Sequence, residues 1–327
     1  MSIELKVQHT SWPIAGSFTI SRGTKTSAEV VMVELSEDGF TGRGECVPYA
    51  RYGETVQSVT DQIMELQADL KNGLDRVSLQ KIMKAGAARN AVDCAFWDLE
   101  AKQAGKRVWD LVGLSDMSNL TTAYTLSLES PEMMGQKAKE NAHLPLLKLK
   151  LAGPDDLDRV AAVRNGAPNS RIIVDANEGW TAEVYQDLAP KLVELGVEMI
   201  EQPLPAGEDE VLRDMVRPVA VCADESCHGL ASLADIEGKY DMINIKLDKT
   251  GGLTEALLLK EAAEKAGLEI MVGCMLGPSL AMAPAMVVGQ GAKVVDLDGP
   301  LLLAKDHEAA LEFNNGIMTP PNSALWG

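Results

Sequence analysis

This sequence of 327 residues has no long apolar run, comparatively few basic residues and few cysteines. No apolar stretch approaches the roughly 18 residues that a membrane-spanning helix needs. Lys and Arg together number 30 against 48 Asp and Glu, which gives a formal net charge of −18. Such an acidic surface repels phosphate backbones and anionic lipids, so we expect neither nucleic acid nor a membrane as a partner.

The five cysteines are scattered along the chain, and none belongs to a Cys-x-x-Cys pair. Their odd number and spacing argue against a disulfide framework and a zinc knuckle, and they suit a reducing compartment. The first residues also lack the basic segment and apolar run of a signal peptide. We therefore expect a cytoplasmic protein. Because 46% of the residues are hydrophobic and 24% are charged, we expect a sizeable packed core.

The first third of the chain shows strand patterns followed by helical ones. Residues 2–11 and 28–35 have the apolar patterns of strands, and Glu37-Asp38-Gly39 is a hairpin turn signal. The pattern becomes helical over residues 55–103. This order predicts an α+β domain over residues 1–115.

From about residue 120, short apolar segments recur, and a helical stretch follows each one. Eight such segments span residues 121–126, 146–151, 171–174, 198–200, 219–222, 242–245, 269–272 and 293–295. The repeat predicts parallel βαβ units, and eight strands close most naturally into a barrel over residues 116–300. A doubly wound open sheet is the alternative, but the Gly-x-Gly-x-x-Gly loop typical of that fold is absent after the first strand. Residues 301–327 show no such repeat and are predicted to return to the first domain.

Charged residues stand at the carboxyl ends of the predicted strands, where the chemistry of a barrel takes place. They are Lys148, Lys150, Asp175, Glu201, Asp224, Lys246, Asp296 and Asp298. Charged groups at an apolar rim are costly to desolvate unless they neutralise one another or bind an ion. Asp175, Glu201 and Asp224 follow consecutive strands, and oxygen ligands without His or Cys favour Mg²⁺ or Mn²⁺ over zinc. One carboxylate alone would equally suit a solvated loop or a helix cap, but three at equivalent strand ends predict a metal site.

Lys150 and Lys246 follow strands that lie four apart in a ring of eight, so we expect them to face each other across the barrel mouth. Two bases on opposite sides of one carbon are what a 1,1-proton transfer requires, since one removes the proton and the other returns it. Nearby cations and a metal would lower the pKa of such a lysine. Lys148 has the same strand parity as Lys150 and could supply positive charge to a developing enolate oxygen of the substrate. A Schiff-base lysine, as in an aldolase, is the alternative, although it would not explain the three carboxylates.

At these positions the sequence resembles the enolase superfamily, in its muconate-lactonizing-enzyme subgroup. The matching motifs are Lys148-Leu149-Lys150, Asp175-Ala176-Asn177, Glu201-Gln202-Pro203, Ala223-Asp224-Glu225-Ser226 and Ile245-Lys246-Leu247-Asp248-Lys249-Thr250-Gly251-Gly252. The resemblance covers nearly the whole chain and implies an α/β fold, a (β/α)7β TIM-like barrel with an N-terminal α+β capping domain. It also implies one Mg²⁺ per site, held by Asp175, Glu201 and Asp224. This ion would stabilise an enediolate after Lys150 or Lys246 removes the α-proton.

Further stretches resemble the dipeptide epimerases, in particular those of the L-Ala-D/L-Glu type. These stretches are residues 21–26, 46–54, 273–280 and 296–300. The likeness implies that Arg22, in a polar loop that could close as a lid, meets the side chain of a substrate glutamate. It also implies that Asp296 and Asp298 hold the ammonium of the substrate, which agrees with their shared strand parity. Lys25 is a departure, since many relatives carry arginine there.

The sequence therefore predicts a Mg²⁺-dependent epimerase whose substrate is a small dipeptide, such as L-Ala-Glu from cell-wall peptide metabolism. Three alternatives stay open at this point. They are an o-succinylbenzoate synthase or cycloisomerase of the same superfamily, a Schiff-base aldolase, and a non-catalytic binding barrel. The exact dipeptide preference and the oligomeric state, a homo-oligomer included, are also left open.

Overall fold

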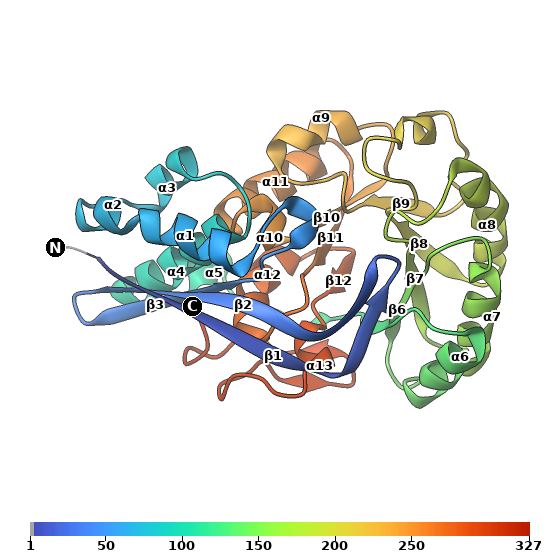
Figure 1. Cartoon of the computed structure of the whole chain (residues 1–327), viewed down its shortest axis with the longest axis horizontal. Helices are drawn as coiled ribbons and strands as arrows, with labels where there is room; N and C mark the ends of the chain where they lie inside the picture. The colour runs from blue at the N-terminus through green and yellow to red at the C-terminus, as the bar shows by residue number, and fades with distance from the viewer. Residues whose placement is uncertain (1–2) are drawn as a thin grey trace.

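A parallel barrel forms the larger part of the molecule, and an antiparallel sheet with its own helices packs against it (Figure 1). The computed structural model describes residues 3–327. This arrangement confirms the predicted fold class, an α/β barrel with an N-terminal capping domain. No helix in the described range is long and apolar enough to cross a membrane. The division of the chain at residues 115 and 300 stays a prediction.

The capping sheet consists of three antiparallel strands, β1 (Glu4–Ile20), β2 (Gly23–Glu37) and β3 (Phe40–Cys46). The predicted turn before β3 is confirmed, because Asp38 and Gly39 have φ values of 52° and 83°, as a two-residue hairpin turn requires. β1 and β2 are longer than the predicted strands. Together they form a hairpin whose tip extends to the barrel (Figure 1).

Five helices follow this sheet in the chain. They are α1 (Val56–Glu65), α2 (Gln67–Lys71), α3 (Arg76–Ile82), α4 (Ala87–Ala104) and α5 (Val108–Leu111). The longest of them, α4, packs directly on β3 because glycine leaves room for it. A Cβ atom added at Gly44 would lie 2.2 Å from the carbonyl oxygen of Ala91, so a larger residue there would force the helix and the sheet apart.

The barrel has eight parallel strands at the positions predicted from the sequence. They are β5 (Tyr124–Leu126), β6 (Leu146–Lys150), β7 (Arg171–Asp175), β8 (Val197–Glu201), β9 (Ala220–Ala223), β10 (Met242–Ile245), β11 (Glu269–Gly273) and β12 (Val294–Asp296). Each strand pairs with its neighbours in chain order. A parallel bridge between Thr122 and Val295 joins the first and last members, so the sheet closes into a barrel.

Helices cover the outside of the barrel between successive strands (Figure 1). They are α6 (Pro131–Glu140), α7 (Asp156–Gly166), α8 (Ala182–Glu194), α9 (Leu233–Ile236), α11 (Leu253–Lys265) and α12 (Ser279–Gly289), with short α10 (Leu247–Thr250) and α13 (Gly299–Leu302) at strand ends. The repeat is weakest between β8 and β9, where the connection forms a 3₁₀ turn, Glu210–Arg213.

The barrel interior is filled by a ring of buried apolar side chains, which closes its floor. The ring consists of Ala123, Leu146, Ile173, Met199, Cys222, Met242, Met271 and Val294. Because strand side chains alternate, the residues two and four positions further along each strand point to the same interior at the carboxyl end. Charged side chains therefore meet above an apolar floor.

The end of the chain contacts both the barrel and the capping helices. Strands β13 (Phe313–Asn314) and β14 (Ile317–Met318) form a small sheet with β4 (Leu120–Thr121). Beyond them, the Trp326 indole donates a hydrogen bond to the carbonyl oxygen of Cys94 in α4, at 3.1 Å. The last residues thus pack against the capping helix α4.

Candidate active site

A cavity of about 760 Å³ lies between the tip of the β1–β2 hairpin and the carboxyl ends of the barrel strands. Seven of the nine side chains predicted for the site line it, namely Arg22, Lys148, Lys150, Asp224, Lys246, Asp296 and Asp298. The other two, Asp175 and Glu201, are fully buried against these side chains. The structure therefore brings all nine residues together at one end of the barrel.

Lys148 stands at the centre of the acidic groups. Its ammonium lies 2.6 Å from Glu201 Oε2, 2.7 Å from Asp296 Oδ2 and 3.2 Å from Asp175 Oδ2. Burial lowers the pKa of Lys148, but these three carboxylates outweigh it and hold the pKa well above its ordinary value. Lys148 is therefore a fixed cation.

Lys150 and Lys246 come from strands four places apart in the ring, as predicted. Lys150 Nζ donates to Asp175 Oδ2 at 2.6 Å, and Lys246 Nζ donates to Asp224 Oδ2 at 2.7 Å. Burial lowers the pKa of Lys246, but the charges of Asp224 and Glu201 raise it well above its ordinary value. In the chain by itself, two carboxylates therefore stabilise the ammonium form of Lys246, and the lowering of its pKa by a bound metal ion stays a prediction.

The buried carboxyl groups differ in their tendency to ionise. Burial and the charge of Asp175 raise the pKa of Glu201 to about 7. Burial acts on Asp175 in the same sense, but the ammonium groups of Lys150 and Lys148 lower its pKa to about 2. The difference arises because Asp175 has ammonium groups at 2.6 and 3.2 Å, whereas Glu201 has one at 2.6 Å and its second, that of Lys246, lies 4.0 Å away.

The lysines also occupy the space between the predicted metal ligands. Within residues 3–327, no three acidic, His or Cys side chains converge on a point in a geometry ready for a metal ion. Glu201 Oε2 is close to the Lys148 ammonium, but the angle does not make a hydrogen bond, and this buried oxygen has no such partner among the described residues. The donor set of three carboxylates fits Mg²⁺, provided that the lysine side chains shift.

Three neighbours for which the sequence predicted no role hold these carboxylates in place. Lys249 Nζ donates to Asp224 Oδ1 at 2.6 Å, Asn244 Nδ2 donates to Glu201 Oε1 at 2.7 Å, and the backbone N–H of Asn177 donates to Asp175 Oδ1 at 2.8 Å. Strand parity was a signal for Asn244, which lies two residues before Lys246. Asn177 has a φ of 46°, a strained conformation two residues after the end of β7.

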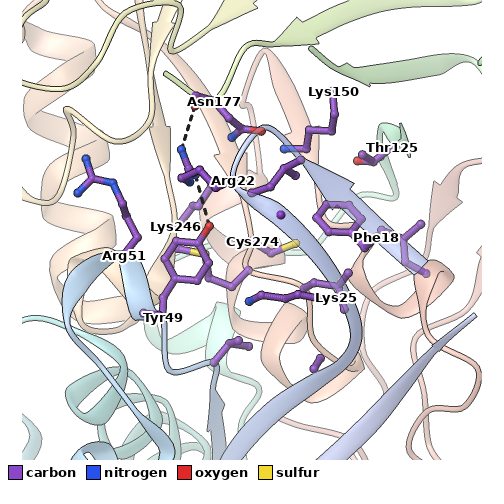
Figure 2. A pocket seen from close by; sticks show the side chains of 18 of the residues that line it. Phe18, Arg22, Lys25, Tyr49, Arg51, Thr125, Lys150, Asn177, Lys246 and Cys274 are labelled. Atoms are coloured by element: carbon purple, nitrogen blue, oxygen red, sulfur yellow. Dashed lines mark hydrogen bonds between the residues drawn. The ribbon is translucent and has the colours of Figure 1, made fainter. Parts of the chain in front are cut away.

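Arg22 lies at the tip of the capping hairpin, between Asn177 and Tyr49 (Figure 2). Its guanidinium donates to the Asn177 carbonyl oxygen at 2.9 Å, to Glu178 Oε2 at 3.1 Å and to Glu225 Oε1 at 2.7 Å. Burial lowers the pKa of Arg22, but Glu225 outweighs it and raises the pKa above its ordinary value. The predicted polar loop is therefore a tight hairpin turn, and its arginine already pairs with carboxylates of the barrel.

Asp296 and Asp298 both line the cavity, in agreement with their shared strand parity. Asp298 Oδ2 accepts a hydrogen bond from the backbone N–H of Thr125 at 2.6 Å. Burial and the nearby charge of Asp296 raise the pKa of Asp298 to about 7. Asp296 Oδ1 is buried without a hydrogen-bond donor among the described residues. A cationic group entering the cavity would relieve the repulsion between these two acids.

The fold and the site define a capped βα-barrel protein whose strand ends carry opposed lysines above a cluster of carboxylates. Residues 2–113 match the family model described as the N-terminal domain of mandelate racemase / muconate lactonizing enzyme. Residues 133–324 match the model described as enolase C-terminal domain-like. The chain belongs to the mandelate racemase / muconate lactonizing enzyme family of the enolase superfamily.

Two relatives match almost the whole chain. The L-Ala-D/L-Glu epimerase of Escherichia coli (strain K12) is 46% identical over 314 residues, which cover 95% of this chain and 98% of the relative. An N-acetyl-D-glutamate racemase of Pseudoalteromonas sp is 44% identical over 300 residues, which cover 91% of this chain and 95% of the relative.

Two solved structures share the fold. An enolase family member from Agrobacterium tumefaciens, with homology to dipeptide epimerases and with bound sodium and L-Ala-L-Glu, has a TM-score of 0.98 at 52% identity. That match covers 99% of this chain and 100% of the other. A dipeptide epimerase from Enterococcus faecalis V583, complexed with Mg and L-Leu-L-Tyr, has a TM-score of 0.91 at 29% identity and covers 98% of this chain and 97% of its own.

Proposed function

We propose that this protein is a Mg²⁺-dependent dipeptide epimerase of the L-Ala-D/L-Glu type, which acts on small cell-wall dipeptides. The observation that carries the proposal is the placement of Lys150 and Lys246 on strands four apart, at opposite sides of one cavity. The identity of 46% to the E. coli L-Ala-D/L-Glu epimerase supports the choice of substrate. The five free cysteines, all within the described residues, are in keeping with the cytoplasm as its compartment.

In the proposed reaction, Lys150 and Lys246 act on opposite faces of the α-carbon of the C-terminal residue. One lysine removes the proton as a base, and the ammonium of the other supplies a proton to the opposite face, which inverts the centre. Lys148 keeps its positive charge and stabilises the negative charge that develops on the substrate carboxylate. Asp175, Glu201 and Asp224 would hold Mg²⁺, which when bound polarises that carboxylate and makes the α-proton more acidic.

The two ends of the dipeptide would bind on opposite walls of the cavity. Asp296 and Asp298 face the cavity as a pair of acids, which suits the ammonium of the N-terminal residue. Arg22 would bind the side-chain carboxylate of the glutamate, and it would have to exchange Glu178 or Glu225 for this new partner. Because those pairs close the hairpin over the barrel, substrate binding and closure would compete for one guanidinium.

Proton exchange in D₂O tests the proposal directly. With Mg²⁺ and L-Ala-L-Glu, proton NMR should show loss of the α-proton signal of the glutamate together with formation of L-Ala-D-Glu. EDTA should stop both changes, and added Mg²⁺ should restore them. A protein that binds the dipeptide without α-proton exchange would contradict the proposal.

A second candidate is racemisation of an N-acylated glutamate, because the N-acetyl-D-glutamate racemase relative is 44% identical. Both substrates present the same reacting carbon and differ in whether an ammonium is available to Asp296 and Asp298. A comparison of kcat/KM for L-Ala-L-Glu and N-acetyl-L-glutamate decides between them. The dipeptide should be the better substrate if the two acids bind an ammonium.

A further inference from the structure

The segment of residues 47–54 comes from the capping domain, and its residues 47–52 line one wall of the cavity. Tyr49 and Arg51 of this segment stand beside Arg22 (Figure 2). Tyr49 accepts a hydrogen bond from Arg22 at 3.4 Å, and Arg51 pairs with Glu178 of the barrel at 2.9 Å. The position of this segment therefore affects the shape of the substrate cavity, although none of its residues comes from the barrel.

A buried carboxylate in the barrel holds the start of this segment. Asp248 lies in α10, two residues after Lys246, and its exposed fraction is 7%. Its Oδ1 atom accepts hydrogen bonds from the backbone N–H of Val47 at 3.1 Å and from Asn90 Nδ2 at 2.8 Å. One oxygen thus joins the barrel segment after β10, the cavity wall and the capping helix α4.

The other end of the segment is held by the capping domain itself. Glu54 Oε2 accepts from the backbone N–H of Tyr49 at 3.0 Å, and Glu54 Oε1 accepts from the backbone N–H of Ala87 at 2.8 Å. Glu54 therefore ties the segment to the start of α4, whereas Asp248 ties it to the barrel. Through Asp248, this segment is joined by a buried hydrogen bond to the helix that directly follows Lys246.

We propose that Asp248 is a positioning residue, which fixes the cavity wall of residues 47–54 relative to Lys246 through its Oδ1 atom. Burying a carboxyl group costs free energy, and burial raises the pKa of Asp248 to about 7. The hydrogen bonds that Asp248 accepts offset this cost. Oδ1 takes both hydrogen bonds, and an asparagine amide offers the same acceptor oxygen. The anchor requires that oxygen and not the negative charge.

Three variants separate the anchor from charge and from general packing. Asp248→Ala removes the acceptor, Asp248→Asn keeps it, and Asn90→Ala removes the other partner of the same oxygen. Hydrogen exchange followed by mass spectrometry should show faster exchange of the Val47 amide, by about tenfold, in Asp248→Ala. Asp248→Asn and Asn90→Ala should keep Val47 protected as in the unaltered protein.

Steady-state kinetics give a second test, which rests on the proposed function and is independent of the hydrogen-exchange measurement. Asp248→Ala should raise the KM for L-Ala-L-Glu by about tenfold with a smaller change in kcat, and Asp248→Asn should restore the KM. If the unaltered protein shows no epimerase activity, the proposed function fails while the exchange arm still tests the anchor. An unprotected Val47 amide in the unaltered protein, or equal effects of Asp248→Asn and Asp248→Ala, would overturn the inference.

Discussion

Lys148 Nζ lies 2.7 Å from Asp296 Oδ2, which joins the second and the last strand of the barrel by a buried ion pair. The same ammonium contacts Glu201 and Asp175, so one cation links the proposed metal ligands to the proposed ammonium site. The two halves of the cavity are therefore electrostatically coupled through Lys148, and a change there affects both.

Replacement of Lys148 by methionine should lower kcat by about 100-fold or more, because a fixed charge beside the developing carboxylate charge is lost. Steady-state kinetics with L-Ala-L-Glu measures the effect. Circular dichroism shows whether the variant still folds when three buried carboxylates lose their contact with the Lys148 ammonium. A folded Lys148→Met variant with unchanged kcat would show that this charge has no part in the reaction.

Single substitutions of the two opposed lysines should separate proton removal from epimerisation. Lys150→Ala and Lys246→Ala should each abolish epimerisation, since both faces of the carbon need an acid or base. Each variant should still exchange the α-proton with D₂O for one epimer, and the two variants should favour opposite epimers. NMR with L-Ala-L-Glu and L-Ala-D-Glu in separate tubes gives the comparison, and epimerisation by either variant argues against the two-base scheme.

Arg22 and Lys25 offer a matched pair of cations on the capping hairpin. Both line the cavity, but Arg22 pairs with two carboxylates, and the Lys25 ammonium lies 5.1 Å from the centre of the Tyr49 ring. Arg22→Met should raise the KM for L-Ala-L-Glu by about tenfold and leave L-Ala-L-Leu nearly unaffected, because leucine has no side-chain carboxylate. If Lys25→Met raised the KM for L-Ala-L-Glu more than Arg22→Met did, Lys25 and not Arg22 would bind the glutamate side chain.

Asp298→Leu should lower kcat/KM for L-Ala-L-Glu by about 100-fold, because the substrate ammonium would lose a buried anionic partner. N-acetyl-L-glutamate has no ammonium, so any turnover of that compound should change by less than about threefold. Parallel assays of both compounds with one enzyme preparation remove differences in folding. If kcat/KM fell equally for both compounds, Asp298 would support the structure of the site and would not bind the ammonium.

The pair of Glu45 and His307 predicts how stability depends on pH. Burial lowers the pKa of His307, but its hydrogen bond to Glu45, at 2.9 Å, raises the pKa above the ordinary 6.5. Burial raises the pKa of Glu45 as well. Both groups hold protons more tightly in the folded state. The stabilisation from His307 is fully present below pH 6.5 and is lost as pH rises through its raised pKa, whereas that from Glu45 is fully present only below pH 4.5 and is lost as pH rises above that value.

Urea unfolding between pH 6 and pH 8.5 checks this dependence. The free energy of unfolding of the unaltered protein should fall more with rising pH than that of His307→Gln. His143→Gln removes an exposed histidine and should behave like the unaltered protein. If the free energy of unfolding of His307→Gln and that of the unaltered protein fell equally with rising pH, His307 would not be the source of the pH dependence.

Much of the barrel and its strand ends was predictable from local patterns. Apolar segments followed by helical stretches place one strand in each repeat, and a strand's parity determines which side chains face the interior. The sequence pattern alone therefore assigns Lys150, Asp175, Glu201, Asp224 and Lys246 to one end of a barrel. The hairpin tip was less predictable, because residues 12–27 carry no clear alternation and pair through a register shift between Pro13 and Phe18.

The sequence by itself determined which charged residues end the barrel strands, because that depends on periodicity within short segments. Only the tertiary structure decided how those charges pair. Lys148 and Asp296 are 148 residues apart and meet because the barrel closes. Arg22 and Glu225, like Val47 and Asp248, are more than 200 residues apart, and their contacts depend on how the capping domain sits on the barrel. These tertiary contacts also decide which carboxyl groups ionise. Burial raises the pKa of Glu201, whereas the nearby ammonium groups of Lys150 and Lys148 lower the pKa of Asp175.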